Sequence, residues 1–222
     1  MNVMSQGNFV VGFVRQLKAG VIVLVALTAI VGLAYPAAVW AVSRIDTHAA
    51  EGSPLADSGG CVVGSELVGV DPQVAAGEPD PFFHLRVVGS VADGDPFAPG
   101  DPAAALPSNQ GPSSEVLAQF VDERRAAIGA REGVAPEDVP VDAVTGSGSG
   151  VDPHISPAYA AIQVPRVART LGIPEDDVLR VVADHTRGRQ LGFLGAERVD
   201  VPGLNVALGA TASDCAGDTS GG

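Results

Sequence analysis

A run of 24 residues without a charged side chain, residues 19–42, constrains this chain more than any other feature. At about 1.5 Å per residue, a helix of that length crosses a hydrocarbon core of about 30 Å. Gly32 and Pro36 would weaken a helix in water, but lipid offers no competing hydrogen-bond partner, so the helix persists with at most a kink. Tyr35 and Trp40 lie near its outer end, where amphipathic rings prefer the headgroup level. We therefore predict one transmembrane helix over residues 19–42.

The alternative to an anchor is a cleaved signal peptide, for which Val39-Trp40-Ala41 is an acceptable small-residue cleavage site. The apolar part of a signal peptide usually spans about 7–15 residues, and this run is longer, which favours an anchor. Arg15 and Lys18 precede the run and Arg44 follows it. The positive-inside rule then predicts a cytoplasmic stub at residues 1–18 and an extracytoplasmic body.

Charge divides the chain at the same place. Residues 1–45 contain three basic and no acidic residues, whereas residues 46–222 contain ten arginines and 26 acidic residues, a net charge of −16. An acidic body repels phosphate backbones, so nucleic-acid binding is not expected. Lys18 is the one lysine of the sequence and borders the apolar run. A phosphate-binding P-loop needs a lysine, so the body cannot contain one.

Two cysteines, Cys61 and Cys215, lie near the two ends of the body. In an oxidising compartment an isolated pair of this kind is a candidate disulfide, whereas in the cytosol both would remain thiols. Because the predicted body is extracytoplasmic, we expect a bridge between Cys61 and Cys215.

Local signals place three helices in the body. Ser113 or Ser114 can cap the first, whose apolar residues recur three and four positions apart. Ser156-Pro157 is typical of a helix start, and the helix that follows is predicted to kink or divide at Pro165. Pro174 opens the third helix.

Strands are predicted at both ends of the body. Residues 61–70 are β-branched and punctuated by glycine, which indicates a strand or short hairpin, and residues 199–208 indicate a closing strand interrupted by Pro202-Gly203. Antiparallel pairing of these terminal strands would bring the two cysteines together. The proline-rich stretch 71–106 is predicted to be a loop held to the core by its phenylalanines.

The expected fold is a transmembrane helix followed by one mixed α/β extracytoplasmic domain, with a linker at 43–60, the domain at 61–208 and a flexible polar tail at 209–222.

The glycine-serine loop, residues 146–150, is the most distinctive candidate site. Successive backbone N–H groups before a helix start could bind an anion, but a tight loop that feeds a capped helix explains the same pattern. Asp152 and His154 next to it are either a polar pair that contacts a partner or simple turn residues. The loop has no G-x-S-x-G nucleophile elbow, and the four histidines have no metal-ligand spacing, so neither a catalytic serine nor a metal site is predicted.

The stretch VTGSGSGVDPHISPAYAAIQVPRVARTLGI, residues 144–173, strongly resembles the C subunit of Kdp-type potassium-transporting ATPases. FFHLR at 82–86, SNQGPSS at 108–114 and HTRGRQLGFLGAERVDVPGLNVAL at 185–208 agree with the same family in order and spacing. Leu85, Val87-Val88, the two cysteines and the polar tail depart from the family pattern.

The resemblance implies a noncatalytic subunit of a four-part pump in the cell membrane. Its implied partners are a channel-like subunit that selects potassium, a P-type ATPase subunit that carries the phosphorylated Asp, and a small single-helix subunit. The family's C subunit has been regarded as a catalytic chaperone that raises the affinity of the ATPase subunit for ATP. No cofactor is then expected to be bound stably, and a nucleotide role would belong here to Ser147, Ser149 and Gln163.

The predicted topology opposes a literal nucleotide site, because ATP is cytoplasmic and the body is expected outside. We therefore expect the body to cap the outer mouth of the channel-like subunit, with any effect on ATP transmitted through the complex. From a different class, the alternative is a membrane-anchored extracytoplasmic hydrolase that uses Ser147 or Ser149 with a histidine and an aspartate.

Overall fold

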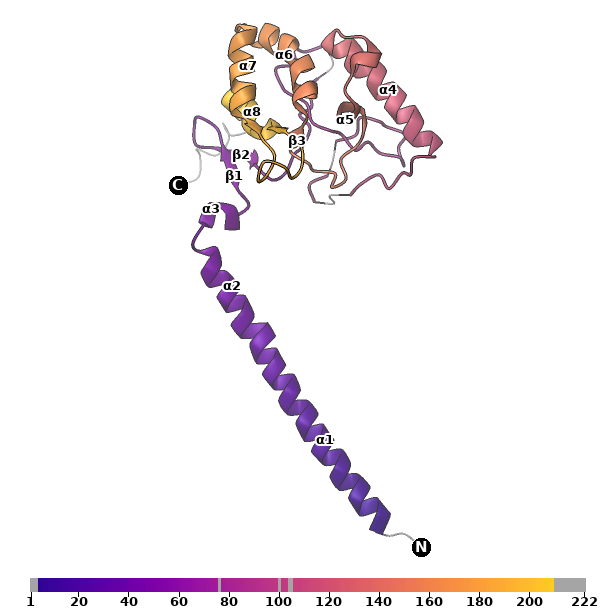
Figure 1. The fold of residues 1–222 in the computed structure, drawn as a ribbon, viewed down its shortest axis with the longest axis vertical. Helices are drawn as coiled ribbons and strands as arrows, with labels where there is room; N and C mark the ends of the chain where they lie inside the picture. Colours follow the sequence, from indigo (N-terminus) through magenta and orange to yellow (C-terminus); the bar gives the residue numbers. More distant parts are fainter. Residues whose placement is uncertain (1–3, 76, 100, 104–105, 210–222) are drawn as a thin grey trace. The chain divides into compact units, whose positions relative to one another are not determined.

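The computed structural model describes residues 4–75, 77–99, 101–103 and 106–209. The chain forms two compact units that divide between Glu51 and Gly52 (Figure 1). The first is helical and the second is a mixed helix and sheet domain. The predicted combination of one apolar helix and one mixed α/β domain is therefore confirmed.

The first unit consists of α1 (Met4–Ala29), a π-helical turn at Ile30–Ala34, α2 (Tyr35–Ser43) and the short α3 (Thr47–Ala50). A stretch of 35 residues, Phe9–Ser43, has a mean hydropathy of 2.4 and is long and apolar enough to cross a membrane. The helical rod begins before the predicted span, so residues 4–18 of the expected stub are helical as well.

The π turn lies directly before Pro36. The backbone N–H of Tyr35 donates to the carbonyl of Ile30, five residues earlier, which widens the turn. A proline ring would otherwise clash with the carbonyl four residues before it, here that of Gly32. The irregularity predicted at Pro36 is thus a local π turn within a continuous helical rod.

Three long helices of the second unit begin where the sequence predicts. They are α4 (Glu115–Glu132), α6 (Pro157–Leu171) and α7 (Glu175–Asp184). Ser114 caps α4 by accepting from the N–H of Leu117, and Ser156 caps α6 by accepting from the N–H of Tyr159. Of the two alternatives predicted at Pro165, the division into two helices is wrong, because α6 runs through the proline as one helix, and the kink stays a prediction.

The strands are short and form two separate sheets in the described part of the chain. β1 (Pro54–Ala56) pairs antiparallel with β2 (Val62–Ser65), while β5 (Arg198–Asp200) lies between β3 (His154–Ile155) and β4 (Thr186–Arg187), antiparallel to both. The predicted pairing of the first and last strands is therefore wrong. The predicted linker at 43–60 is also partly structured, since it contains α3 and β1.

The closing strand predicted over residues 199–208 is confirmed only at its start, where β5 ends at Asp200. Residues 204–208 were expected to be extended, but α8 (Val201–Ala207) covers most of them. Asp200 caps α8 by accepting from the N–H of Gly203, and Pro202 occupies the first turn, where its missing N–H costs nothing. This turn of the chain directs Asn205 into the core.

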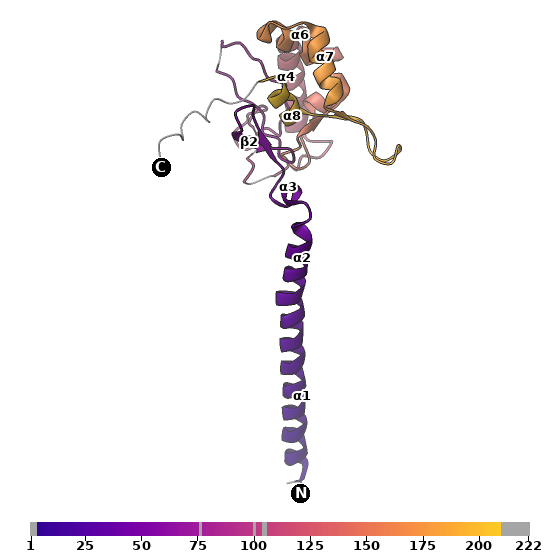
Figure 2. The same ribbon diagram turned by 90° about the vertical axis from the view of Figure 1, so that its left-hand side faces the viewer.

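The core lies where α6 meets α4, α7 and β5. It includes the fully buried Phe83 and Leu204, so the irregular segment 82–88 and α8 close it. Arg124 of α4 is also buried, and its guanidinium donates to the carbonyls of Val88, Pro96 and Val144 at 2.7–3.1 Å. These bonds hold the proline-rich stretch and α5 (Val141–Val144) against α4, beside the short 3-10 turn Pro136–Asp138. Figure 2 shows the same helices from the side.

Candidate functional site

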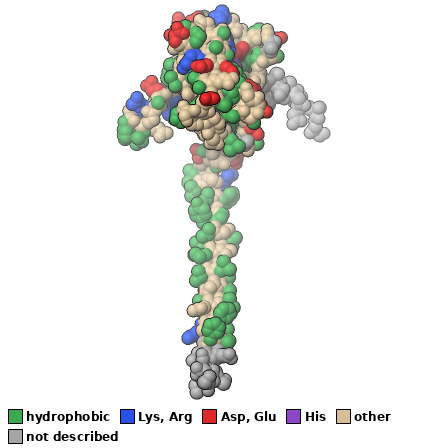
Figure 3. Space-filling model, turned by 90° about the vertical axis from the view of Figure 1, so that its right-hand side faces the viewer, with side chains coloured by type: hydrophobic (Ala, Val, Ile, Leu, Met, Phe, Trp, Pro, Cys, Tyr) green, Lys and Arg blue, Asp and Glu red, His purple; other side chains and the backbone are tan. Residues whose placement is uncertain are grey.

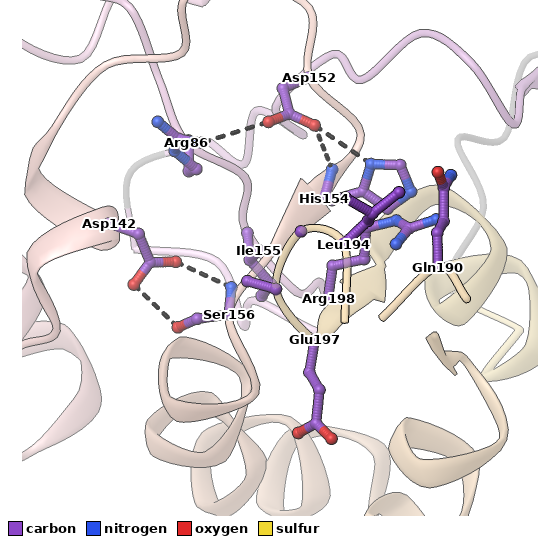
Figure 4. Close-up of a pocket in the computed structure, with 12 residues that line it drawn as sticks. Arg86, Asp142, Asp152, His154, Ile155, Ser156, Gln190, Leu194, Glu197 and Arg198 are labelled. Carbon is purple, nitrogen blue, oxygen red and sulfur yellow. Dashed lines mark hydrogen bonds and ion pairs between the residues drawn. The ribbon is translucent and has the colours of Figure 1, made fainter. Parts of the chain in front are cut away.

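A cleft of about 440 Å³ opens beside β3 and the start of α6 (Figure 4). One wall is formed by the segment that leads into α6, and the other by the loop between β4 and β5. Apolar atoms form much of its lining, and its polar or charged residues are Arg86, Asp142, Asp152, His154, Ser156, Gln190, Glu197 and Arg198.

Asp152 is the centre of the polar wall. Its carboxylate pairs with the guanidinium of Arg86 at 3.2 Å, and it accepts from the backbone N–H of His154 at 3.0 Å. The Nδ1 atom of His154 lies 3.2 Å from the same carboxylate. Arg86 also donates to the carbonyl of Gly146 at 3.2 Å, which ties the cleft to the glycine-serine loop. Asp152 and His154 therefore lie together at a cleft, and both a partner-contact role and a simple turn role stay open predictions.

Asp142 and Ser156 form the floor near the helix start. The carboxylate of Asp142 accepts from the backbone N–H and the hydroxyl of Ser156, both at 2.8 Å. Because the Ser156 hydroxyl in turn caps α6, this carboxylate fixes the direction in which α6 leaves the cleft. These groups are structural, since their hydrogen bonds are made within the chain.

The two serines of the glycine-serine loop differ in burial, since Ser147 is buried and Ser149 is exposed. The Ser147 hydroxyl oxygen accepts from the N–H groups of Ser149 and Gly150 at 3.2 and 3.1 Å. The Ser149 hydroxyl lies 3.1 Å from that of Ser147 and accepts from the N–H of Val151. Among the described residues neither hydroxyl is hydrogen-bonded to a histidine, so the arrangement that the hydrolase alternative needs is not supported.

Gln163 of α6 is fully buried in the core. Its side-chain oxygen accepts from the backbone N–H of His84 at 2.8 Å, and its nitrogen donates to the His84 carbonyl at 3.2 Å. Asn205 of α8 makes the same pair of bonds to Phe83, at 2.8 and 3.0 Å. The two side-chain amides thus supply hydrogen-bond partners to the backbone N–H and C=O groups of a buried irregular segment that pairs with no strand.

The His84 side chain lies between two carboxylates. Its Nδ1 is 3.0 Å from Asp71 and its Nε2 is 2.7 Å from Asp80. Burial lowers the pKa of His84, but the hydrogen bonds to Asp71 and Asp80 outweigh it, and the net pKa is raised. Burial likewise raises the pKa of Asp80, but the hydrogen bond and charge of His84 and the charge of Arg166 lower it to about 2. His84 therefore favours the protonated form.

Arg166 extends this buried network into α4. Its Nε donates to Glu132 at 2.9 Å, and its other nitrogens donate to the carbonyls of Asp80 and Phe82. Glu132 also accepts from Arg131 at 2.6 Å. No sequence motif indicates this network, because its members come from positions up to 86 residues apart.

The remaining predicted residues do not join the cleft. Cys61 lies directly before β2, and Cys215 lies outside the described residues, so the expected bridge stays a prediction. Within the described ranges, no group of three or more His, Cys, Asp or Glu side chains is placed to hold a metal ion. Internal bonds occupy the Ser147 hydroxyl and the Gln163 amide, and the nucleotide role of Ser147, Ser149 and Gln163 stays a prediction.

Arg86 and the β4–β5 loop are the cleft residues that the sequence analysis missed. Both lie within stretches that resemble the Kdp family, FFHLR and HTRGRQLGFLG, so the resemblance was the available signal. The spacing of the residues gives no signal for this cleft, because Arg86 and Asp152 are 66 positions apart.

Comparison with known proteins matches residues 17–210 to the family described as the K+-transporting ATPase, c chain. The potassium-transporting ATPase KdpC subunit of Kineococcus radiotolerans is 47% identical over 194 residues, which cover 87% of this chain and 93% of the relative. The KdpC subunits of Methylorubrum extorquens and Sorangium cellulosum are both 43% identical, each over 87% of this chain and 96% of the relative. The chain therefore belongs to the KdpC family of potassium-transporting ATPase subunits.

Proposed function

We propose that this chain is a noncatalytic subunit whose body lies outside the cytoplasm and binds the outer surface of the channel-like subunit of a Kdp-type pump. Family membership carries the proposal, because the match spans the membrane helix and the body together. An accessory role in potassium transport follows from the family itself. The outer placement rests on Arg15 and Lys18 before the membrane helix and on the long acidic body after it.

The polar groups of the body support a binding role. The buried amides, Arg124, Arg166 and the loop serines are engaged in bonds that hold the fold together. The cleft around Asp152 instead presents charged side chains to solvent, with the Arg86 and Asp152 side chains 25% and 30% exposed. Groups that are fixed in position but partly exposed suit recognition of a partner.

In the proposed assembly the membrane helix packs against the channel-like subunit and the body caps its outer mouth. The P-type ATPase subunit supplies the phosphorylated Asp, and the small single-helix subunit completes the complex. With a net charge of −16 from residue 46 onward, the body would also raise the local cation concentration near the entrance, an effect that salt weakens.

A chaperone effect on ATP fits this assembly as coupling between subunits. If the chain binds the ATP-bound pump more tightly than the ATP-free pump, its presence raises the ATP affinity by the same factor. No contact between the body and ATP is needed. The prediction that Ser147, Ser149 and Gln163 touch nucleotide is the competing proposal, and it requires a cytoplasmic body.

Deletion and co-purification test the proposed function. In a strain without other potassium uptake systems, deletion of this chain should abolish growth at very low potassium, and a plasmid copy should restore it. A tagged chain should co-purify with a channel-like subunit and a P-type ATPase subunit. Unimpaired growth of the deletion strain, or purification of the tagged chain alone, would contradict the proposal.

A further inference from the structure

The chain from Arg187, the last residue of β4, to Glu197, directly before β5, forms an arm, defined here as residues 187–197. All eleven residues of the arm are exposed. In Figure 2 the arm is the yellow hairpin that leaves the domain beside α7 and α8. A segment that buries so little of itself does not serve the stability of the isolated domain.

The tip of the arm is apolar. Leu191 is 82% exposed, Phe193 68% and Leu194 48%. Figure 3 shows the arm as a projection with hydrophobic side chains gathered at its end and basic side chains beside them. Exposed clusters of large apolar side chains on a small surface mark binding sites, and a buried aromatic often supplies much of the binding energy.

The tip has a defined shape. The backbone N–H of Gln190 donates to the carbonyl of Leu194 and the reverse bond also forms, both at 2.9 Å. Leu191 has a φ of +53°, a conformation that costs energy for a residue with a side chain. A lipid layer accepts apolar side chains in any arrangement, whereas a protein pocket requires a fixed one. A preorganised tip therefore favours a pocket in another protein.

The charge of the arm differs from that of the rest of the body. The arm contains two arginines and one glutamate, a net charge of +1, whereas the remainder of residues 46–222 contains eight arginines and 25 acidic residues, a net charge of −17. An acidic partner would be repelled by most of the body and attracted to this segment. The complementary pocket should thus be apolar inside and acidic at its rim.

The arm is continuous with the cleft at Asp152. Gln190 and Leu194 line the cleft and also form the base of the tip. Because the chain is one subunit of a multi-subunit ATPase family, another subunit is available to cover both surfaces. We propose that the arm inserts its apolar tip into an acid-rimmed pocket on the outer surface of the channel-like subunit. This inference rests on the proposed function and adds the contact that would carry it.

Photo-crosslinking in the whole complex tests the contact directly. With benzoylphenylalanine at position 193 of the full chain, irradiation of the complex in membranes should join this chain to the channel-like subunit. A product with the ATPase subunit, with a second copy of this chain or with lipid only would overturn the proposal.

Retention in the purified complex gives a second test. The double variant L191S/F193S should reduce retention of the channel-like subunit at least about tenfold, because two central apolar contacts are lost. Leu67, 60% exposed on the β2 side of the domain, provides the matched control, and L67S should leave retention unchanged. Equal retention of wild type and double variant, or equal loss in L67S, would contradict an anchor at the tip.

The two levels of inference fail differently. If the wild-type chain does not co-purify with a channel-like subunit, the proposed function fails. If the wild type co-purifies, and the double variant does so at the same level, the assembly stands and the arm is not its anchor.

Discussion

Two segments that resemble the same family behave in opposite ways in this structure. The segment 82–86 has no regular secondary structure, yet its phenylalanine at 83 is fully buried. The arm has its own backbone bridge, yet Phe193 is 68% exposed. The stretches FFHLR and HTRGRQLGFLG therefore belong to the core and the surface, respectively.

The two segments differ in whether the rest of the chain supplies hydrogen-bond partners for their backbone and covers their apolar side chains. Side chains of α6 and α8 take the backbone bonds of residues 83 and 84, and Asp71 accepts from the N–H of Leu85 at 2.7 Å. Nothing within the described chain covers the apolar tip of the arm to a similar degree. The irregular segment 82–86 is thus held in place by hydrogen bonds from the rest of the chain. The arm, although it has a defined backbone, leaves its apolar side chains exposed and available to a partner.

The largest expected effect comes from the buried phenylalanine. Phe83→Ala should lower the free energy of unfolding by about 3–5 kcal/mol, because it removes a fully buried ring and leaves a cavity. Denaturant unfolding of the detergent-solubilised chain would measure it. A loss below about 1 kcal/mol would show that segment 82–86 does not hold the core.

Gln163 distinguishes a structural role from a nucleotide role. Gln163→Leu should destabilise the fold by about 2–3 kcal/mol, since the N–H and carbonyl of His84 lose their partners while buried. The same unfolding experiment measures this loss, and the ATPase rate of the assembled complex at varied ATP provides the other readout. A change in apparent ATP affinity with unaltered stability would instead support the nucleotide proposal.

Local signals explain how much of the fold could be predicted. The starts of α4, α6 and α7 were correct because a cap residue or a proline marks each start within a few residues. The strand predicted at 204–208 is wrong because a short apolar run does not distinguish a strand from a buried helix. The available signal was Asp200 followed by Pro202, a cap and a first-turn proline.

The candidate site was predictable only in part. Asp152 and His154 lie two positions apart, and the sequence therefore joined them. Arg86 and the arm approach them only through the tertiary fold, as do Asp71 and Asp80 around His84. Gln163 was placed near nucleotide by resemblance, and nothing in the sequence indicated that its amide faces His84.

The buried network predicts a pH dependence with two limbs. The raised pKa of His84 contributes stability that is complete below about pH 6.5 and is lost as pH rises through the raised value. The lowered pKa of Asp80 contributes stability that is present above about pH 4 and is lost as pH falls toward about 2. Unfolding midpoints measured from pH 5 to 9 should therefore decline on the alkaline side.

His84→Gln should flatten this alkaline decline, because no imidazolium remains between the carboxylates. His154→Gln is the control, since its ring lies at the exposed cleft and is 31% exposed. An unchanged decline in H84Q would assign the dependence to other groups.

The smallest expected effect is at the arm. Phe193→Ser should change the free energy of unfolding by less than about 0.5 kcal/mol, because the side chain is exposed and packs on little. Measuring Phe193→Ser and Phe83→Ala under the same conditions compares the contributions of the two phenylalanines to the free energy of unfolding. A loss above about 1.5 kcal/mol would mean that the tip stabilises the domain itself and would remove the reason to assign it to a partner.

Protease accessibility tests the outer placement of the body most directly. Trypsin should cleave the exposed arm after Arg187 or Arg189 when it is added outside spheroplasts that express this chain without its partners. On a reducing gel, an N-terminal tag should then report a fragment that ends at one of these arginines. Full-length protein that is cleaved only after the membrane is lysed would place the body in the cytoplasm and contradict its docking on the outer face of the pump.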